Sequence, residues 1–307
     1  MYDFLIVGGG PAGLSAAIYA ARFHLKTIVI TKQVGGTIVN AHLIENWPGV
    51  KSSSGLDLME KFREHVEHLG VEIKQDDIVE IKRGGKNFLA KTRSGGALEA
   101  RSILLATGSE HRKLDIPGEN EFQGKGVSYC ATCDAAFFKG KTVAVVGGSD
   151  SAVKESILLS EYAKQVYVIY RGDRLRAEPI NISRMDKKKN IEIVSNTNVV
   201  EIKGDKFVTG AVLDKPYEGS KDFRLDGLFV EVGYMPGSNL ARDMGVVVNE
   251  RKEIIVDNRC KTNVEGVFAA GDVTNTGFKQ VVTAAADGVK AAFSAYKYLG
   301  GLDLESK

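Results

Sequence analysis

Two glycine-rich turns, each directly after a short apolar run, constrain the fold of this chain more than any other feature of its sequence. The first run, Tyr2 to Val7, leads into Gly8-Gly9-Gly10-Pro11-Ala12-Gly13, and the second, Thr142 to Val146, leads into Gly147-Gly148-Ser149-Asp150-Ser151-Ala152. A segment of helical pattern follows each turn. Glycines at such a strand-to-helix turn permit a tight bend and the close approach of a pyrophosphate to backbone N–H groups. Because Gly147 stands 139 positions after Gly8, the turns predict two separate mononucleotide-binding units.

The remaining pattern predicts an α/β chain with two Rossmann-like nucleotide-binding domains, the second inserted into the first. A length of 307 residues suits two domains better than one. After the second turn and its strands, the sequence returns to an apolar segment ending in Gly271-Asp272 and to an alanine-rich helix from about Gln280 to Leu299. We therefore expect residues 1–112 and 241–307 to form one discontinuous domain and residues 113–240 to form the other.

Composition and charge narrow the class of protein. A formal net charge of only +2 provides no bulk attraction to nucleic acid or anionic lipid. The longest uncharged run, Phe4 to Ala21, is divided by the glycine turn into a strand and a helix, so we do not expect it to span a membrane. Asp3 stands where a secretory signal would carry positive charge. We expect a cytoplasmic protein without nucleic-acid or membrane partners.

The most informative segment for chemistry is Cys130-Ala131-Thr132-Cys133-Asp134. Two thiols three positions apart can close a small disulfide ring and reopen it by exchange. A zinc site needs about four Cys or His ligands, whereas the only other cysteine is the solitary Cys260, which we expect to fill space in a strand. An inert buried pair is a further alternative. The pair therefore predicts redox chemistry, and we expect no metal site.

Several other segments resemble, in order and spacing, the FAD-binding segments of low-molecular-weight thioredoxin reductases. They are Gly35-Gly36-Thr37, Glu45-Asn46-Trp47-Pro48-Gly49, Ala106-Thr107-Gly108, and Gly271-Asp272 followed by Lys279-Gln280-Val281. The resemblance covers essentially the whole chain and implies that the discontinuous domain binds FAD and that the inserted domain, which carries the cysteine pair, binds NAD(P)H. The FAD-binding residues that it implies are Gly8, Gly10, Pro11, Ala12, Gly13, Lys32, Gly35, Gly36, Thr37, Asn46, Ala106, Thr107, Gly108, Gly271, Asp272, Lys279, Gln280 and Val281. Taken alone, Ala106 to Gly108 could be a strand-ending turn and Asp272 a helix cap.

The same resemblance assigns roles around the cysteine pair. It implies that Cys133 faces the flavin and receives its electrons, and that Cys130 attacks the disulfide of the partner protein. Asp134 would protonate the departing thiolate, although an aspartate here could instead cap a helix. The implied partner is thioredoxin or a thioredoxin-like disulfide protein, and the implied assembly is a homodimer.

The second turn departs from the pattern of that family, which leaves the electron donor less tightly specified. Ser149 stands at the second glycine position. The family has two adjacent arginines and a third arginine four positions after the second. In this chain Arg171 and Arg176 match the first and third of these, and Gly172 stands in place of the second. Two guanidinium groups could still bind a 2′-phosphate, so NADPH is the predicted donor. The NADPH-binding residues expected are Gly148, Ser149, Asp150, Ser151, Arg171 and Arg176.

Alternatives remain open for this half of the reaction. NADH or reduced ferredoxin could feed the same disulfide chemistry, and the arginines could belong to a solvated loop. A ferredoxin- or flavodoxin-NADP reductase-like flavoprotein could use the same scaffold without the cysteines. A non-catalytic flavin redox sensor is the candidate from another class, although two nucleotide sites exceed what a sensor needs.

Overall fold

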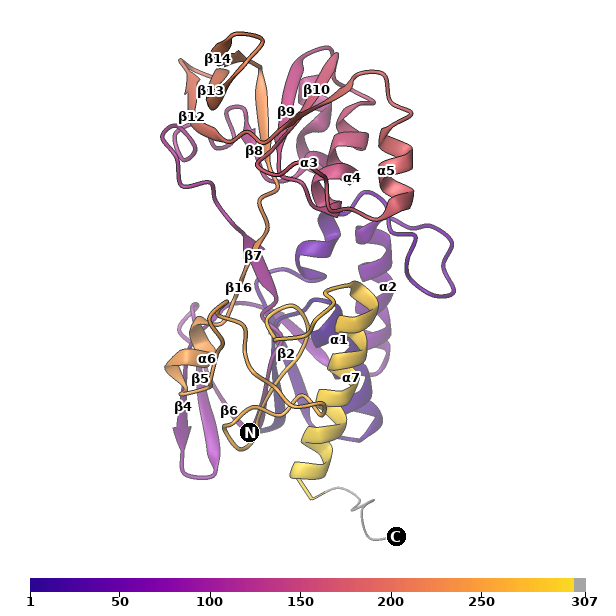
Figure 1. Cartoon of the computed structure of the whole chain (residues 1–307). Helices are drawn as coiled ribbons and strands as arrows, with labels where there is room; N and C mark the ends of the chain where they lie inside the picture. The colour runs from indigo at the N-terminus through magenta and orange to yellow at the C-terminus, as the bar shows by residue number, and fades with distance from the viewer. Residues whose placement is uncertain (301–307) are drawn as a thin grey trace. The chain divides into compact units, whose positions relative to one another are not determined.

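The computed structural model describes residues 1–300, which divide into two compact units (Figure 1). Of the described residues, unit 1 contains 1–110 and 235–300, and unit 2 contains 111–234. The chain crosses between them at β7 (Ser109–His111) and β16 (Tyr234–Pro236), which pair with each other. The predicted fold class, with one α/β domain inserted into another, is confirmed. The cofactor bound by each domain stays a prediction.

The sheet of unit 1 has the order β3-β2-β1-β6-β5-β4, and β17 also pairs with β6. Its strands are β1 (Tyr2–Val7), β2 (Thr27–Thr31), β3 (Glu72–Gln75), β4 (Ile78–Gly84), β5 (Asn87–Thr92), β6 (Ala97–Leu105) and β17 (Val267–Ala269). The pairs that join β3, β2, β1, β6 and β17 are parallel, and β5 runs antiparallel to both β4 and β6. The carboxyl ends of the parallel strands therefore lie at one edge of the sheet, where the first glycine turn begins.

The central strands of this sheet are covered on both faces, which explains why β2, β17 and the second halves of β1 and β6 are continuous buried runs. Along β1, Phe4 and Ile6 pack with α1 (Pro11–Arg22) and α7 (Val281–Tyr298), whereas Leu5 and Val7 pack in a separate cluster on the other face. Figure 1 shows α1 and α7 side by side. Alanines at the shared surface are fully buried and keep the two helices close: Ala16, Ala17, Ala20, Ala291, Ala292 and Ala295.

The other helical elements of unit 1 are η1 (Gly36–Asn40), α2 (Gly55–His68) and α6 (Asn239–Asp243). In α2 the buried apolar residues, among them Leu58 and Val66, recur at helical spacing. Ser54 begins this helix as its N-cap, because its hydroxyl oxygen accepts the N–H of Asp57 at 3.0 Å.

Unit 2 contains a parallel sheet of order β11-β10-β9-β15-β8 and an antiparallel sheet of order β12-β13-β14. The strands are β8 (Val127–Ser128), β9 (Thr142–Val146), β10 (Gln165–Tyr170), β11 (Ile191–Ser195), β12 (Val199–Gly204), β13 (Val208–Tyr217), β14 (Ser220–Arg224) and β15 (Gly227–Val230). The helices are α3 (Ala131–Asp134), η2 (Ala135–Phe138), α4 (Asp150–Leu159) and α5 (Pro179–Met185). The cysteine pair and the second glycine turn thus belong to the same unit.

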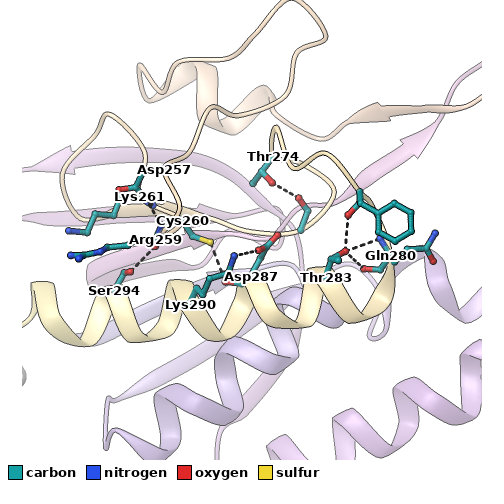
Figure 2. Close-up of polar contacts among 12 residues, drawn as sticks. Asp257, Arg259, Cys260, Lys261, Thr274, Gln280, Thr283, Asp287, Lys290 and Ser294 are labelled. Carbon is teal, nitrogen blue, oxygen red and sulfur yellow. Dashed lines mark hydrogen bonds and ion pairs between the residues drawn. The ribbon is translucent and has the colours of Figure 1, made fainter. Parts of the chain in front are cut away.

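The prediction that Cys260 lies in a strand is wrong. Cys260 has a φ of +61°, in the left-handed region, and its N–H donates to the carbonyl oxygen of Asp257 at 3.0 Å. The Asp257 carboxylate also accepts the N–H groups of Arg259 and Lys261, so it folds this segment into a turn. The buried Cys260 thiol donates to the carbonyl oxygen of Asp287 in α7 at 3.4 Å (Figure 2).

Candidate active site

Cys130 and Cys133 are joined by a disulfide bond, with their Cα atoms 5.4 Å apart. Cys130 is the N-cap of α3, and its sulfur accepts the N–H of Cys133 at 3.2 Å. The side chain of Cys133 is exposed and that of Cys130 is half-buried. A disulfide in which one sulfur is exposed is open to thiol exchange.

Hydrogen bonds hold the backbone on both sides of Cys130. The Ser128 hydroxyl oxygen accepts the N–H of Cys130 at 3.0 Å, and the N–H of Asp134 donates to the carbonyl oxygen of Cys130 at 3.2 Å. Asp134 is the last residue of α3, so it is not the N-cap of that helix, and no side-chain capping bond is formed where it precedes η2. Its predicted role as a proton donor stays a prediction.

The alternatives for the cysteine pair can be compared with these contacts. Zinc would need the two sulfurs as separate thiolates with further ligands. Among residues 1–300, no group of three or more His, Cys, Asp or Glu side chains is placed to hold a metal ion. The pair is also not enclosed in a core, because Cys133 is exposed. A reversible disulfide fits this arrangement better than either alternative.

A cluster of carboxyl groups next to the disulfide was not found by sequence reasoning. The N–H of Ala131 donates to Oε1 of Glu155 in α4 at 3.0 Å. Glu155 also interacts with Glu231, which follows β15 and is 3% exposed. Burial is the largest cause that raises the pKa of both carboxyls, and repulsion by Glu155 raises that of Glu231 further. The available signal was Glu231 itself, a single charge inside the apolar run from Leu228 to Val232.

The first glycine turn, in unit 1, has a backbone that only glycine can form at two positions. Gly8 has a φ of +111°, and a Cβ there would lie 2.2 Å from the carbonyl oxygen of Ala106. A Cβ on Gly13 would lie 1.9 Å from the carbonyl oxygen of Gly8. Gly10 differs, because the nearest atom to a Cβ there, the Gly35 carbonyl oxygen, is 3.9 Å away. The turn therefore closes tightly on itself and leaves room beside Gly10.

The start of α1 fits a bound phosphate. Pro11 occupies its first turn, no side chain caps the helix, and no acidic residue lies in that turn. The first N–H groups of the helix are thus available as donors, and the helix dipole places partial positive charge there. The room beside Gly10 and these donors are what a pyrophosphate requires, so the residues present fit a dinucleotide.

Segments far apart in the sequence meet at this turn, as the resemblance implies. The N–H of Gly35 donates to the Gly9 carbonyl oxygen at 2.7 Å, and a Cβ on Gly36 would lie 3.3 Å from the Gly10 Cα. Gly271 approaches Ala12, because a Cβ on Gly271 would lie 3.0 Å from the Ala12 Cβ. The structure thus brings together the turn, the Gly35-Gly36 segment, Ala106 and Gly271.

A second contact joins two predicted FAD-binding residues that are 234 positions apart. Asn46 Nδ2 donates to Gln280 Oε1 at 3.0 Å. Gln280 is the N-cap of α7 and forms a capping box with Thr283, which Figure 2 shows at the first turn of the helix. Val281, the next residue, is buried in a small cluster with Ile44 and Leu58. Asp272 is therefore not the cap of α7, and that alternative reading of Asp272 is wrong.

The charged residues predicted at the first site have protein partners. Lys279 Nζ forms an ion pair with Glu253 at 2.5 Å and donates to the carbonyl oxygen of Asp272 at 3.0 Å. Burial raises the pKa of the Asp272 carboxyl. Lys32 lies within 3.6 Å of Asp77 and 3.9 Å of Glu110, so its charge is shared with carboxylates of unit 1.

The remaining residues predicted for FAD lie near these segments. The Thr107 hydroxyl donates to the Gly237 carbonyl oxygen at 2.8 Å, and Gly108 has a φ of +61°. Thr37 is in η1. Their contacts with a cofactor stay predictions.

The second glycine turn, in unit 2, is packed against an aromatic ring. A Cβ on Gly147 would lie 2.2 Å from the Glu231 carbonyl oxygen. A Cβ on Gly148 would lie 2.3 Å from Cδ2 of Tyr170, and one on Gly172 would lie 2.6 Å from Cε1 of the same ring. The ring of Tyr170 thus occupies the space beside both glycines. Sequence reasoning missed this role of Tyr170, which stands two positions before Gly172, the position of the family's second arginine.

The loop that carries the predicted 2′-phosphate ligands is tied to this turn. The N–H of Arg176 donates to the Gly148 carbonyl oxygen at 2.6 Å. Asp150 accepts hydrogen bonds from the N–H of Glu178 at 3.0 Å and from Asn181 Nδ2 at 2.8 Å. The side chains of Arg171 and Arg176 are exposed, and the Ser149 hydroxyl does not cap α4. Ser151 lies in the first turn of the same helix.

Comparisons with known proteins give a consistent result. The family model described as pyridine nucleotide-disulphide oxidoreductase matches residues 2–288. A thioredoxin reductase of Listeria monocytogenes is 43% identical over 97% of this chain and 94% of its own length. A thioredoxin reductase of Bacillus subtilis is 39% identical over 97% and 95%. The crystal structure of Lactococcus lactis thioredoxin reductase is 39% identical, with a TM-score of 0.93 over 97% of this chain and 99% of that one.

The helices of residues 1–300 were also compared with the requirements for crossing a bilayer. None of them combines the length and the apolar character that a membrane span needs.

Proposed function

The chain belongs to the pyridine nucleotide-disulphide oxidoreductase family, and from this premise we propose that it is a thioredoxin-disulfide reductase. In the proposed reaction, electrons pass from NADPH through FAD to the Cys130–Cys133 disulfide and then to thioredoxin or a thioredoxin-like protein. The observation that carries this proposal is the disulfide itself, with Cys133 exposed. It occurs in a chain that is 43% and 39% identical to two thioredoxin reductases over 97% of its length.

The residues of unit 1 fit FAD. The N–H groups at the start of α1 would hold the pyrophosphate, beside the open space at Gly10. Asp272 and the Asn46–Gln280 pair would bind the remainder of the cofactor. When bound, FAD supplies two-electron transfer between a nicotinamide and a disulfide.

The residues of unit 2 would carry out the thiol steps. Reduction breaks the S–S bond, adds two electrons and takes up protons at the sulfurs. Cys130 then attacks the partner's disulfide as a thiolate, and Cys133 displaces the reduced partner. Cys133 N–H, which donates to the Cys130 sulfur at 3.2 Å, would stabilise that thiolate. Asp134 would supply the proton to the departing thiolate.

NADPH is the proposed donor, bound at the second glycine turn by Arg171 and Arg176. Both side chains are exposed, and the loop is anchored to Gly148 through the N–H of Arg176. A serine at position 149 and the missing arginine at position 172 weaken this site relative to the family's pattern. NADH and reduced ferredoxin are therefore the alternatives that an experiment must separate.

Anaerobic titration of the FAD-loaded protein tests the donor directly. Bleaching of the flavin absorbance by NADPH, with little bleaching by NADH, is the expected result. Bleaching by reduced ferredoxin alone would show that the donor assignment is wrong and leave the disulfide chemistry in place.

The disulfide step is tested with Cys133→Ser, and Cys260→Ser is the matched control. Cys133→Ser is expected to abolish NADPH-driven reduction of thioredoxin while flavin reduction continues. Cys260→Ser removes a thiol from a buried turn and is expected to keep both activities. Undiminished turnover of Cys133→Ser with ferredoxin or flavodoxin as acceptor would favour the ferredoxin- or flavodoxin-NADP reductase alternative. The absence of sustained turnover in the unmodified protein would favour a redox sensor.

Assembly and location complete the proposal. We propose a cytoplasmic homodimer, on the basis of the resemblance to thioredoxin reductases. Sedimentation of the flavin-loaded protein would test the dimer.

A further inference from the structure

The first N–H group of α3, the short helix that Cys130 caps and that contains Cys133, is bound by the mostly buried carboxyl group of Glu155. The N–H of Ala131, the residue after Cys130, donates to Glu155 Oε1 at 3.0 Å. The other oxygen, Glu155 Oε2, is buried and meets no hydrogen-bond donor among the residues that the structure describes. The neighbouring acidic group is Glu231, which is almost fully buried.

A proton shared by the two carboxyls would account for this arrangement. Two carboxylates held together away from water cannot both be ionised without a large cost. If one of them is protonated, it can donate the hydrogen bond that the other lacks. Burial and the repulsion between the two groups both act to keep a proton on the pair.

Within residues 1–300, the charged groups that act on the pKa values of the pair are other carboxyls, and no cation is among them. His111 Nδ1 lies 3.8 Å from Glu231 Oε1, too far for a hydrogen bond, and burial lowers the pKa of His111, which favours the neutral imidazole. Asp134, on the cysteine helix, adds a further negative charge near Glu155. The nearest lysine of α4, Lys154, forms its ion pair with Asp150 at 2.7 Å.

We propose that Glu155 and Glu231 form a proton-holding pair whose charge is coupled to ionisation of the Cys130 thiol, which makes both of them positioning residues for the thiol chemistry. This inference rests on the proposed disulfide reductase function. A thiolate on Cys130 and a carboxylate on Glu155 would be bound by N–H groups of the same short turn, those of Cys133 and Ala131. Because two negative charges held by the same short turn repel each other, a proton on Glu155 favours the thiolate of Cys130.

The coupling matters at one step of the reaction. Opening the disulfide breaks the S–S bond, adds the two electrons that the proposed activity supplies, and takes up one proton if Cys130 remains a thiolate. The pair keeps its own proton in that state, so the turn carries one new negative charge instead of two. The thiolate is the form of Cys130 that attacks the partner.

The test measures the pKa of Cys130 in the reduced, flavin-loaded protein. Rates of iodoacetamide alkylation would be followed from about pH 5 to pH 9.5, with Cys130 and Cys133 resolved by peptide mass spectrometry. While the pair holds one proton, its single negative charge is shared by the two carboxyls, and Glu155→Gln removes the part of that charge that falls on Glu155 beside Ala131. The glutamine keeps an oxygen to accept the N–H of Ala131. The substitution is expected to lower the pKa of Cys130 by about one unit, so that roughly ten times more thiolate is present below both pKa values.

Glu231→Gln is expected to change the pKa of Cys130 in the opposite direction. Without the second carboxyl, Glu155 loses its proton more readily and carries a full charge beside Ala131. The pKa of Cys130 should then rise, by about half a unit. A role in structure alone predicts no such opposed pair of shifts.

Glu161→Gln is the matched control, because it removes the same charge from an exposed side chain just after α4. Its Cys130 pKa should equal that of the unmodified protein. An unchanged pKa in Glu155→Gln, or shifts of the same sign in both pair variants, would overturn the inference. Alkylation requires neither a nucleotide donor nor thioredoxin. The pKa of Cys130 can therefore be compared among the variants even if the protein fails to reduce thioredoxin, so failure of the proposed function and failure of this inference are distinguished.

Discussion

Replacing Gly172 with arginine would restore the two adjacent arginines found in low-molecular-weight thioredoxin reductases. We predict that this substitution destabilises unit 2 unless Tyr170 is also replaced. A Cβ at position 172 would lie 2.6 Å from Cε1 and 2.8 Å from Cζ of the Tyr170 ring. The ring cannot move away, because Gly148 packs against its other edge. The packing there is so close that a Cβ on Gly148 would lie only 2.3 Å from Cδ2 of the ring. Tyr170 is 9% exposed and thus has little free space.

The expected cost follows from the packing. Overfilling a packed site typically costs about 1–3 kcal/mol. For a unit of this size, that corresponds to a fall in Tm of about 4–12 °C. The backbone at Gly172 is not left-handed, so the cost is steric and a smaller residue at position 170 should remove it.

The assay combines thermal unfolding with flavin reduction by NADPH and NADH. Gly172→Arg alone should melt lower, whereas Tyr170→Ala/Gly172→Arg should recover stability relative to the sum of the single changes. With a further guanidinium available for the 2′-phosphate, the double variant should bind NADPH about tenfold more tightly, as one charge-assisted hydrogen bond provides. Gly84→Arg, at an exposed glycine with nothing within 4 Å of its Cβ position, is the control. A Gly172→Arg protein that melts like the unmodified chain would refute the steric argument.

Three further predictions concern other sites. Gly13→Ala, whose methyl group would lie 1.9 Å from the Gly8 carbonyl oxygen, should lower the stability of unit 1 by several kcal/mol and yield colourless protein on purification; normal flavin absorbance would contradict this. Burial raises the pKa of Cys260 to about 12, so iodoacetamide at pH 8 should modify this thiol only in guanidinium chloride, and modification of the native protein would show that the turn opens. The raised pKa values of Glu155 and Glu231 mean that the folded chain binds their protons more tightly than the unfolded chain does. Their contribution to stability should therefore be present below about pH 4.5 and be lost as the pH rises through the folded-state pKa values. In Glu231→Gln, the denaturant concentration at the unfolding midpoint should fall less between about pH 5 and pH 9 than it does in the unmodified protein.

The features of the fold that the sequence predicts correctly are those encoded by neighbouring residues. The two strand-turn-helix units depend on local apolar runs and on glycines that follow them, and the structure has both. The Cys130–Cys133 disulfide depends on a spacing of three, and it is also present. The predicted family and the two-domain α/β fold are confirmed by the comparisons and by the structure.

What the sequence does not predict depends on residues that meet only after folding. Glu155 and Glu231 lie on different elements, and no local pattern relates them. The packing of Tyr170 against Gly148 and Gly172 requires the distance between two loops. Cys260 was misplaced because a single carboxylate, that of Asp257, turns an apparently strand-like segment. The residues assigned to FAD and NADPH stay predictions, even where the structure brings them together.

The close approach of α1 and α7 sets an order on how the chain can assemble during synthesis. A Cβ on Gly288 of α7 would lie 2.0 Å from the Ala12 carbonyl oxygen, so the backbones of these two helices, far apart in the sequence, pack closely near the first turn. The strands and helices of unit 2 come from one continuous stretch, residues 111–234, and can all emerge from the ribosome before α7 has been made. Until α7 is synthesised, the buried alanines of α1 lack the helix surface that covers them, so unit 1 cannot complete its core before the residues from 281 onward have been made.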